Sequence, residues 1–272
     1  MRSSLPTLAF AALFALPLLA APAASADILR LAGTGGAMPM AEHIAAAYLA
    51  VSGTKIEVIP GLGSKGAIQA AADGAIELAI SARELTTKEA ALGLTAVPIA
   101  RTALVFVTSR TRPTGLESTE LTSIFSSPDP KWADGSPIQL ILRTTQDGDT
   151  LILEGLIAGM HEAIETARLR PEIPVASTDQ DSADLAEQLT GSFVQAGYSQ
   201  IVTEKRNLRF IAIDGVEPTL ENFETGKYPY EKVFYLVYAG PYEAAAKHLL
   251  EFLGSAKGQT ILRETGNVPV AG

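Results

Sequence analysis

The chain has 272 residues and no cysteine, and its 21 basic and 30 acidic side chains give a net charge of −9. The acidic balance argues against a nucleic-acid or anionic-membrane partner. The lack of cysteine excludes disulfides, thiolate metal sites and a cysteine nucleophile. The length suits one large or two medium domains with a core that needs no disulfides.

The N-terminal segment has the pattern of a cleavable secretory signal peptide. Arg2 supplies the positive charge, residues 8–21 form the apolar stretch, and Ala24-Ser25-Ala26 matches the cleavage site. We therefore expect residues 1–26 to be removed, the mature chain to begin at Asp27, and the protein to be exported.

The first part of the mature chain predicts a strand–helix alternation. The expected strands are 28–31, 55–59 and 75–81, with helices that begin near Pro39 and Ala67. This β-α-β-α-β order is typical of a parallel, doubly wound sheet, in which ligands bind beyond the carboxyl ends of the strands.

Three loops should meet at that edge of the sheet, namely 33–38, 61–66 and 81–85. The first two are rich in glycine and lead into helices, whose free N-terminal amides form a ready anion site. The alternative is that they are ordinary strand-to-helix turns.

The rest of the chain predicts a second α/β unit. The expected strands are 104–108, 138–142, Ile201, 208–213 and 233–238, and the expected helices are 117–125, 150–158, 182–189, 241–253 and 258–265. We expect two lobes, with the chain crossing near Thr108 and returning near Val233.

Arg143 comes directly after the expected strand 138–142, so its guanidinium should lie at a strand end, where it could hold an oxyanion with two hydrogen bonds. The turn that follows offers Thr150 and backbone amides such as that of Gly148 as donors. Asp147 or Asp149 could accept a proton from a hydrogen-bearing oxyanion. The alternative is that Asp149 or Thr150 caps a helix and Arg143 is a surface charge.

Three further polar residues flank the first loops. Ser81 could donate its hydroxyl to an anion, and Ser64 could do the same or cap a helix. Arg83 could pair with the anion or bridge the lobes, or it could form a salt bridge with Glu84 or Asp73.

An enzyme is not indicated. His43, His161 and His248 lie far apart within expected helices, without metal-ligand spacing. There is no G-x-S-x-G motif, and the first glycine-rich turn lacks the third glycine of a dinucleotide fingerprint. We therefore expect no catalysis, no metal and no cofactor.

Several segments together resemble the phosphate-binding subunits of bacterial ABC transporters, within the type II periplasmic binding proteins. These segments are GTGGAMP, GLGSKGAIQAAADGAIELAISAREL, the arginine ahead of a Gly/Asp-Thr turn, and LTGSFVQAGY at 189–198. The resemblance implies a two-lobed α/β fold, each lobe a mixed, mostly parallel sheet flanked by helices, with two crossover strands as a hinge. Lobe I would comprise 27–107 and 238–272, and lobe II 108–237.

The resemblance also implies a function. The protein would be a monomer in the periplasm that captures an inorganic oxyanion, phosphate above all, by hinge closure and delivers it to an inner-membrane permease. Backbone amides of Gly36, Ala37 and Met38 would be first-loop donors. The site would also contain the Ser64 hydroxyl, the Arg143 clamp and Thr150.

The chain departs from the family pattern at three points, one of which is that Arg143 lies one residue further from the threonine. Asp147-Gly148-Asp149-Thr150 stands where the family has Gly-Ser-Gly-Thr, and Ala82 and Arg83 follow Ser81 where many phosphate binders place an acceptor aspartate. The acceptor would then be Asp149 or Asp147. A second hypothesis is a sensory binding module for another oxyanion or a small organic solute.

Overall fold

The computed structural model describes residues 28–270, and the expected signal peptide at 1–26 lies outside these residues. The strands are β1 (Ile28–Gly33), β2 (Lys55–Ile59), β3 (Leu78–Ser81), β4 (Leu94–Thr108), β5 (Gln139–Leu140), β6 (Leu142–Arg143), β7 (Val175–Ala176), β8 (Ser192–Gly197), β9 (Arg209–Phe210), β10 (Glu231–Ala239) and β11 (Val268–Pro269). The α-helices are α1 (Met38–Ser52), α2 (Gly63–Ala72), α3 (Thr87–Ala90), α4 (Ser118–Ser126), α5 (Gly148–Leu156), α6 (Met160–Arg168), α7 (Asp179–Gln188), α8 (Tyr198–Thr203), α9 (Leu220–Glu224), α10 (Glu243–Gly254) and α11 (Ala256–Glu264). Two 3₁₀ helices, η1 (Gly35–Ala37) and η2 (Gly240–Tyr242), precede α1 and α10.

The main sheet is mixed. Its strand order is β2-β1-β3-β10-β4-β8-β5, with β9 and β11 also pairing with β4, while β6 and β7 form a separate parallel pair. β1 runs parallel to β2 and β3, whereas β10 is antiparallel to both β3 and β4. The predicted α/β fold, with a mixed sheet flanked by helices, is confirmed.

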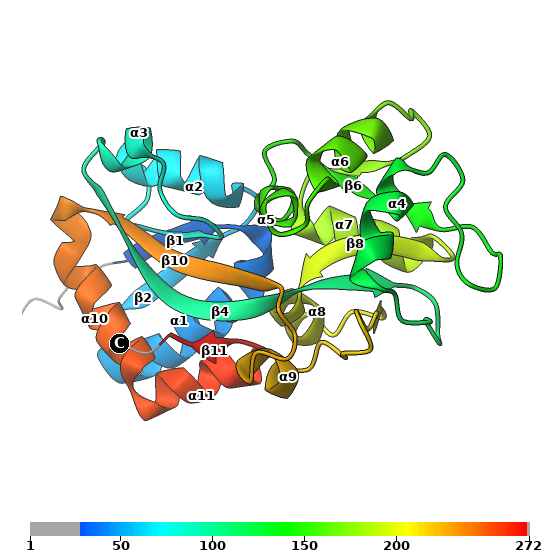
Figure 1. The fold of residues 1–272 in the computed structure, drawn as a ribbon. Coiled ribbons are helices and arrows are strands. Elements are labelled where there is room, and N and C mark those ends of the chain that lie inside the picture. Colours follow the sequence, from blue (N-terminus) through cyan, green and yellow to red (C-terminus); the bar gives the residue numbers. More distant parts are fainter. Residues whose placement is uncertain (1–27, 271–272) are drawn as a thin grey trace, which may run out of the picture.

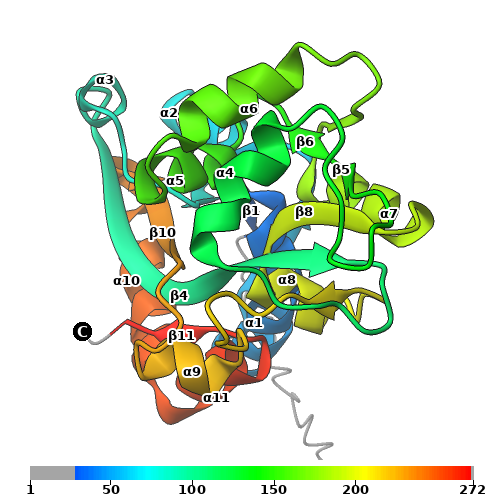
Figure 2. The same ribbon diagram turned by 45° about the vertical axis from the view of Figure 1, so that its right-hand side comes forward.

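Three clusters of buried hydrophobic side chains form two groups, because two of the clusters pack on the same strands. The first, here called the N-terminal core, lies among β1, β3, α1, α2 and α10, and its members come from residues 29–100 and 234–262. The second, the central core, lies around β8, α4, α6 and α7, with members from 103–230 and Val268. Figures 1 and 2 show the two groups of helices at opposite ends of the long strand β4. β4 carries side chains of the N-terminal core in its first half and of the central core in its second half, and β10 begins directly after Tyr230 of the central core.

The first helix illustrates how local sequence makes these elements. Met40, Ile44 and Tyr48 recur at helical spacing and are all buried, so α1 presents an apolar face to the N-terminal core. Pro39 occupies the first turn, where its missing N–H costs nothing. Gly53 ends the helix in a left-handed conformation, with φ of 72°.

Two sequence expectations about these elements were wrong. The expected strand 138–142 is divided between β5, which pairs with β8, and β6, which pairs with β7. Ile201 is not in a strand but is buried in α8, a short helix that directly follows β8. Tertiary packing decides such short apolar segments, because their pattern alone fits either structure.

β4 begins at Leu94, ten residues before the expected strand start. Its first half contains Pro98 and Arg101, which weaken a strand pattern, and it is held by pairing with β10 along most of its length.

No helix of the described residues is long and apolar enough to cross a membrane.

Candidate functional site

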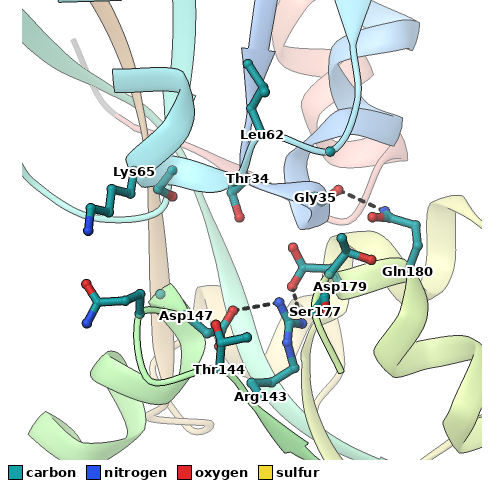
Figure 3. Close-up of a pocket in the computed structure, with 16 residues that line it drawn as sticks. Thr34, Gly35, Leu62, Lys65, Arg143, Thr144, Asp147, Ser177, Asp179 and Gln180 are labelled. Carbon is teal, nitrogen blue, oxygen red and sulfur yellow. Dashed lines mark hydrogen bonds and ion pairs between the residues drawn. The ribbon is translucent and has the colours of Figure 1, made fainter. Parts of the chain in front are cut away.

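A polar cavity of about 180 Å³ lies where the N-termini of four helices meet. These are the η1–α1 turn, α2, α5 and α7. The residues that line the cavity are Thr34, Gly35, Gly61, Leu62, Gly63, Ser64, Lys65, Arg143, Thr144, Gln146, Asp147, Gly148, Ser177, Thr178, Asp179 and Gln180. Figure 3 shows Thr34 and Lys65 on one side of the cavity and Arg143 and Asp147 on the other. The first amides of a helix lack intrahelical partners, so this convergence creates a site suited to an anion.

The elements that supply these walls follow strands. β1 leads into η1 and α1, β2 into α2, β6 into α5, and β7 into α7. Parallel pairing of β6 with β7 sets Arg143 opposite Ala176, and so brings Arg143 next to the turn that opens α7.

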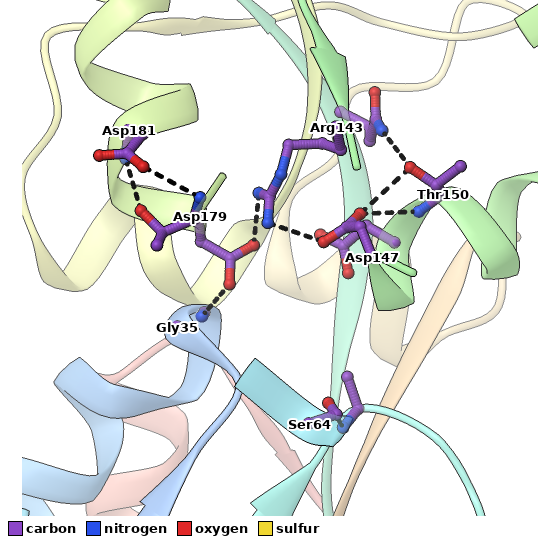
Figure 4. Close-up of polar contacts among 12 residues, drawn as sticks. Gly35, Ser64, Arg143, Asp147, Thr150, Asp179 and Asp181 are labelled. Atoms are coloured by element: carbon purple, nitrogen blue, oxygen red, sulfur yellow. Dashed lines mark hydrogen bonds and ion pairs between the residues drawn. The ribbon is translucent and has the colours of Figure 1, made fainter. Parts of the chain in front are cut away.

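Arg143 is the central cation of the site, and it is buried with only 5% of its surface exposed. Its Nη2 donates to Asp147 Oδ1 at 2.7 Å, and its Nη1 donates to Asp179 Oδ1 at 2.9 Å (Figure 4). Burial alone would lower the pKa of Arg143, but the charges of Asp179 and Asp147 outweigh it and raise the pKa. The guanidinium is therefore a fixed positive charge held between two carboxylates.

Asp147 caps the start of α5 and also lines the cavity. Its Oδ2 accepts a hydrogen bond from the Thr150 N–H at 2.9 Å, so Asp147 is the N-cap of the helix. Burial and the neighbouring charge of Asp149 raise the pKa of Asp147 to about 6, against the opposing effect of Arg143. This carboxyl group faces the cavity and exchanges its proton close to neutral pH.

Asp179 connects the two cores. Its Oδ1 pairs with Arg143, and its Oδ2 accepts a hydrogen bond of 2.8 Å from the Gly36 N–H in η1. Burial would raise the pKa of Asp179, but Lys232 and Arg143 together hold it below its ordinary value. The next residue, Gln180, donates from Nε2 to the Gly35 carbonyl at 3.1 Å. Two consecutive side chains of α7 thus contact the glycine-rich turn before α1.

Lys232 is a second buried cation. It lies on β10 with no exposed surface and forms an ion pair with Asp149, itself only 1% exposed. A Cβ atom on Gly36 would lie 3.1 Å from the Lys232 Nζ, so the ammonium lies directly behind the η1 turn. Burial would lower the pKa of Lys232, but Asp149 and Asp179 raise it above the ordinary value.

The structure brings four of the predicted site residues to the cavity: Ser64, Arg143, Asp147 and Gly148. Gly36 takes part through its N–H bond to Asp179. The Ser64 hydroxyl also accepts a hydrogen bond from the Ala82 N–H at 3.0 Å, which ties α2 to the end of β3.

Other predicted site residues do not line the cavity. The N–H groups of Ala37 and Met38 donate to the Thr34 and Gly35 carbonyls within the 3₁₀ turn. Asp149 and Thr150 are buried behind the wall of the cavity, with Asp149 facing Lys232.

Ser81 and Arg83 are also absent from the cavity wall. The Ser81 hydroxyl donates to the Arg83 carbonyl at 2.7 Å, so it is used within its own turn. The Arg83 guanidinium pairs with both carboxylate oxygens of Glu89 at 2.8 Å. The expected salt bridge from Arg83 to Glu84 or Asp73 was therefore wrong in its partner, because Arg83 pairs with Glu89 instead.

The alternatives for the second lobe are corrected as well. Arg143 is buried rather than a surface charge, and the helix cap is Asp147 rather than Asp149 or Thr150. Asp147 is the cap because its carboxylate accepts a hydrogen bond from the backbone N–H of Thr150, three residues later in the first turn of α5.

Sequence reasoning missed Asp179 and Lys232. Thr178 and Asp181 form a capping box, a pattern that could have placed the start of α7 at Asp179 instead of Ser182. Lys232 alternates with Phe234 and Leu236, both fully buried, so the period of a strand places Lys232 on the buried face.

Comparison with known proteins agrees with this architecture. Residues 20–257 match the model of the PBP superfamily domain, and the chain therefore belongs to this superfamily. It is 24% identical over 249 residues to the phosphate-binding protein PstS of Borreliella burgdorferi, a match that covers 88% of each chain.

Solved structures with the same fold include two phosphate-transport proteins. A candidate phosphate ABC transporter substrate-binding protein from Clostridium perfringens, solved with bound phosphate, has a TM-score of 0.79 at 20% identity. An ABC-type phosphate transport receptor from Vibrio cholerae has a TM-score of 0.65 at 18% identity. Both matches cover 90% of this chain and the whole of the other chain.

Proposed function

We propose that this protein is a periplasmic solute-binding protein that captures phosphate and delivers it to the permease of an ABC transporter. The observation that carries the proposal is the convergence of four helix N-termini and the buried Arg143 on one polar cavity. Membership of the PBP superfamily and the named function of the PstS relative support it. These relatives favour transport over a sensory module for another solute, and a binding role over catalysis.

The anion would be held from both sides. The N-terminal core would contribute the Ser64 hydroxyl and the first amides of α2, and the central core would contribute Arg143 and the Gly148 amide. Closure would exclude water from these donors and so strengthen each hydrogen bond. Hinge motion would occur in β4, whose side chains belong to both cores, and at the start of β10, where the chain leaves the central core.

The lobe boundaries are part of this proposal. Side chains of β4 change from the N-terminal core to the central core between Ala100 and Ala103. The chain returns from the central core at Tyr230, just before β10, to the N-terminal core at Phe234. We place the hinge in these two stretches, a few residues before the divisions at 107/108 and 237/238 expected from the sequence.

Asp147 would be the acceptor for the proton of a protonated oxyanion. Asp147 lines the cavity, whereas Asp149 does not and forms an ion pair with Lys232. A carboxylate at this position favours HPO₄²⁻, which can donate a hydrogen bond, over sulfate, which cannot. Export through the N-terminal signal peptide would place the mature chain, as a monomer, in the periplasm.

Calorimetric titration of Arg143→Lys with phosphate tests the assignment of the clamp. Lysine keeps the charge but cannot form two parallel hydrogen bonds, so we expect phosphate affinity to fall at least about tenfold. The matched control is Arg263→Lys, because Arg263 forms an exposed bridge to Glu224 away from the cavity. Equal affinity in wild type and Arg143→Lys would contradict the role of Arg143.

A further inference from the structure

Asp179 occupies hydrogen-bonding groups that a bound anion would need. One carboxylate oxygen lies 2.9 Å from Arg143 Nη1, and the other lies 2.8 Å from the backbone nitrogen of Gly36. A guanidinium and a backbone amide near a helix N-terminus are the donors that hold an oxyanion. The Asp179 carboxylate is thus an anion that belongs to α7 and already accepts hydrogen bonds from both donors, Arg143 Nη1 and the Gly36 N–H.

We propose that Asp179 is a tethered competitor of the transported anion, which latches the two cores together and sets the affinity for phosphate. This inference rests on the proposed function and deepens it. An incoming anion must displace the Asp179 carboxylate from Arg143 and from the Gly36 N–H. The contact defined by Asp179, Gly36 and Arg143 is here called the Asp179 bridge.

The packing around the Asp179 bridge shows that the turn is shaped to receive this side chain. A Cβ atom on Gly35 would lie 2.6 Å from Asp179 Oδ2 and 2.6 Å from Gln180 Oε1. Glycine at this position therefore allows the α7 side chains to approach the backbone. Gln180 reinforces the contact by donating to the Gly35 carbonyl and to Glu204.

The charges near the Asp179 bridge define its effect on an anion. Two cations, Arg143 and Lys232, face three carboxylates, those of Asp147, Asp149 and Asp179. An anion that enters while Asp179 stays in place meets a surplus of negative charge. Displacement of Asp179 removes one negative charge from the donors and frees both hydrogen bonds at once.

The affinity of wild type is then reduced by the fraction of molecules in which Asp179 occupies the donors. Removing the charge with Asp179→Asn weakens the Asp179 bridge without changing the size of the side chain. We expect this variant to bind inorganic phosphate about tenfold more tightly than wild type.

The test uses the full mature chain and two readouts. Hydrogen exchange of the Gly36 amide, measured by NMR without phosphate, reports the Asp179 bridge directly. We expect faster exchange in Asp179→Asn, and also in Gly35→Ala, whose methyl group pushes the side chains of Asp179 and Gln180 aside without altering any charge. Asp181→Asn is the matched control, because Asp181 lies on the same first turn but bonds only within the capping box.

Calorimetric titration with phosphate is the second readout. Unchanged Gly36 exchange in both Asp179→Asn and Gly35→Ala would overturn the proposal, as would phosphate binding that Asp179→Asn leaves equal or weakens. Failure of the proposed function would look different, because neither wild type nor Asp179→Asn would then bind phosphate at all.

Discussion

Five charged side chains meet behind and around one cavity, and their pairing explains why they can be buried. Arg143 is held between Asp147 and Asp179, and Lys232 balances Asp149. An isolated buried charge costs far more free energy than a hydrogen bond returns, so each of these groups depends on its partner. The cluster therefore contributes to the shape of the site more than to net stability.

Lys232 provides the clearest stability test of this cluster. No further hydrogen-bond donor among residues 28–270 reaches the Asp149 carboxylate, so Lys232→Met would leave a buried, unbalanced charge. We expect the free energy of unfolding in urea to fall by about 3–5 kcal/mol. The double variant Lys232→Met/Asp149→Leu should recover most of that loss, because neither charge then remains.

Lys247→Met is the matched control for this measurement. Lys247 pairs with Glu243 on α10, and both side chains are more than half exposed. Its removal should change the free energy of unfolding by less than about 1 kcal/mol. A loss in Lys232→Met no larger than in Lys247→Met would show that the buried pair is not needed.

At the scale of single elements, α5 carries a pH-sensitive cap. Folding raises the pKa of Asp147 to about 6, above its value in an unfolded chain, so the folded protein binds this proton more tightly. The contribution of Asp147 to stability is therefore greatest at acidic pH and is lost as pH rises through about 4 to 6.

Asp147→Asn should remove this dependence. Relative to the variant, the free energy of unfolding of wild type should decrease by about 1–3 kcal/mol between pH 4 and pH 7, measured by urea unfolding across that range. Asp129→Asn, which alters an exposed pair with Lys131, should follow the wild-type curve. Parallel curves for wild type and Asp147→Asn would show that Asp147 does not titrate in this way.

The ends of elements also show what a sequence can predict. The glycine-rich turns, the start of α1 and the limits of β2 follow from local rules and agree with the structure. Arg143 was predicted because it follows a strand directly. Asp179 was missed because its function depends on Gly36, which is 143 residues away. Pairing of β6 with β7 brings Arg143 next to α7, but no local pattern encodes the contact between Asp179 and Gly36.

At the scale of the whole molecule, the sequence predicted two α/β units and crossings near Thr108 and Val233, but not that β4 and β10 pair with each other. The two strands are antiparallel neighbours over the whole of β10 and the first two thirds of β4, and β4 contributes side chains to both cores. Lys232 lies on β10 between Tyr230 of the central core and Phe234 of the N-terminal core. A buried charge that lies behind the cavity wall thus stands on a strand proposed as part of the hinge.

Above all, we propose that this cavity captures phosphate in preference to sulfate. Calorimetric titration of the purified mature chain with phosphate, and separately with sulfate, tests it most directly. We expect saturable one-to-one binding of phosphate and no binding of sulfate at the same concentration, because only the protonated anion can donate a hydrogen bond to Asp147. Equal binding of sulfate, or no phosphate binding by either wild type or Asp179→Asn, would contradict it.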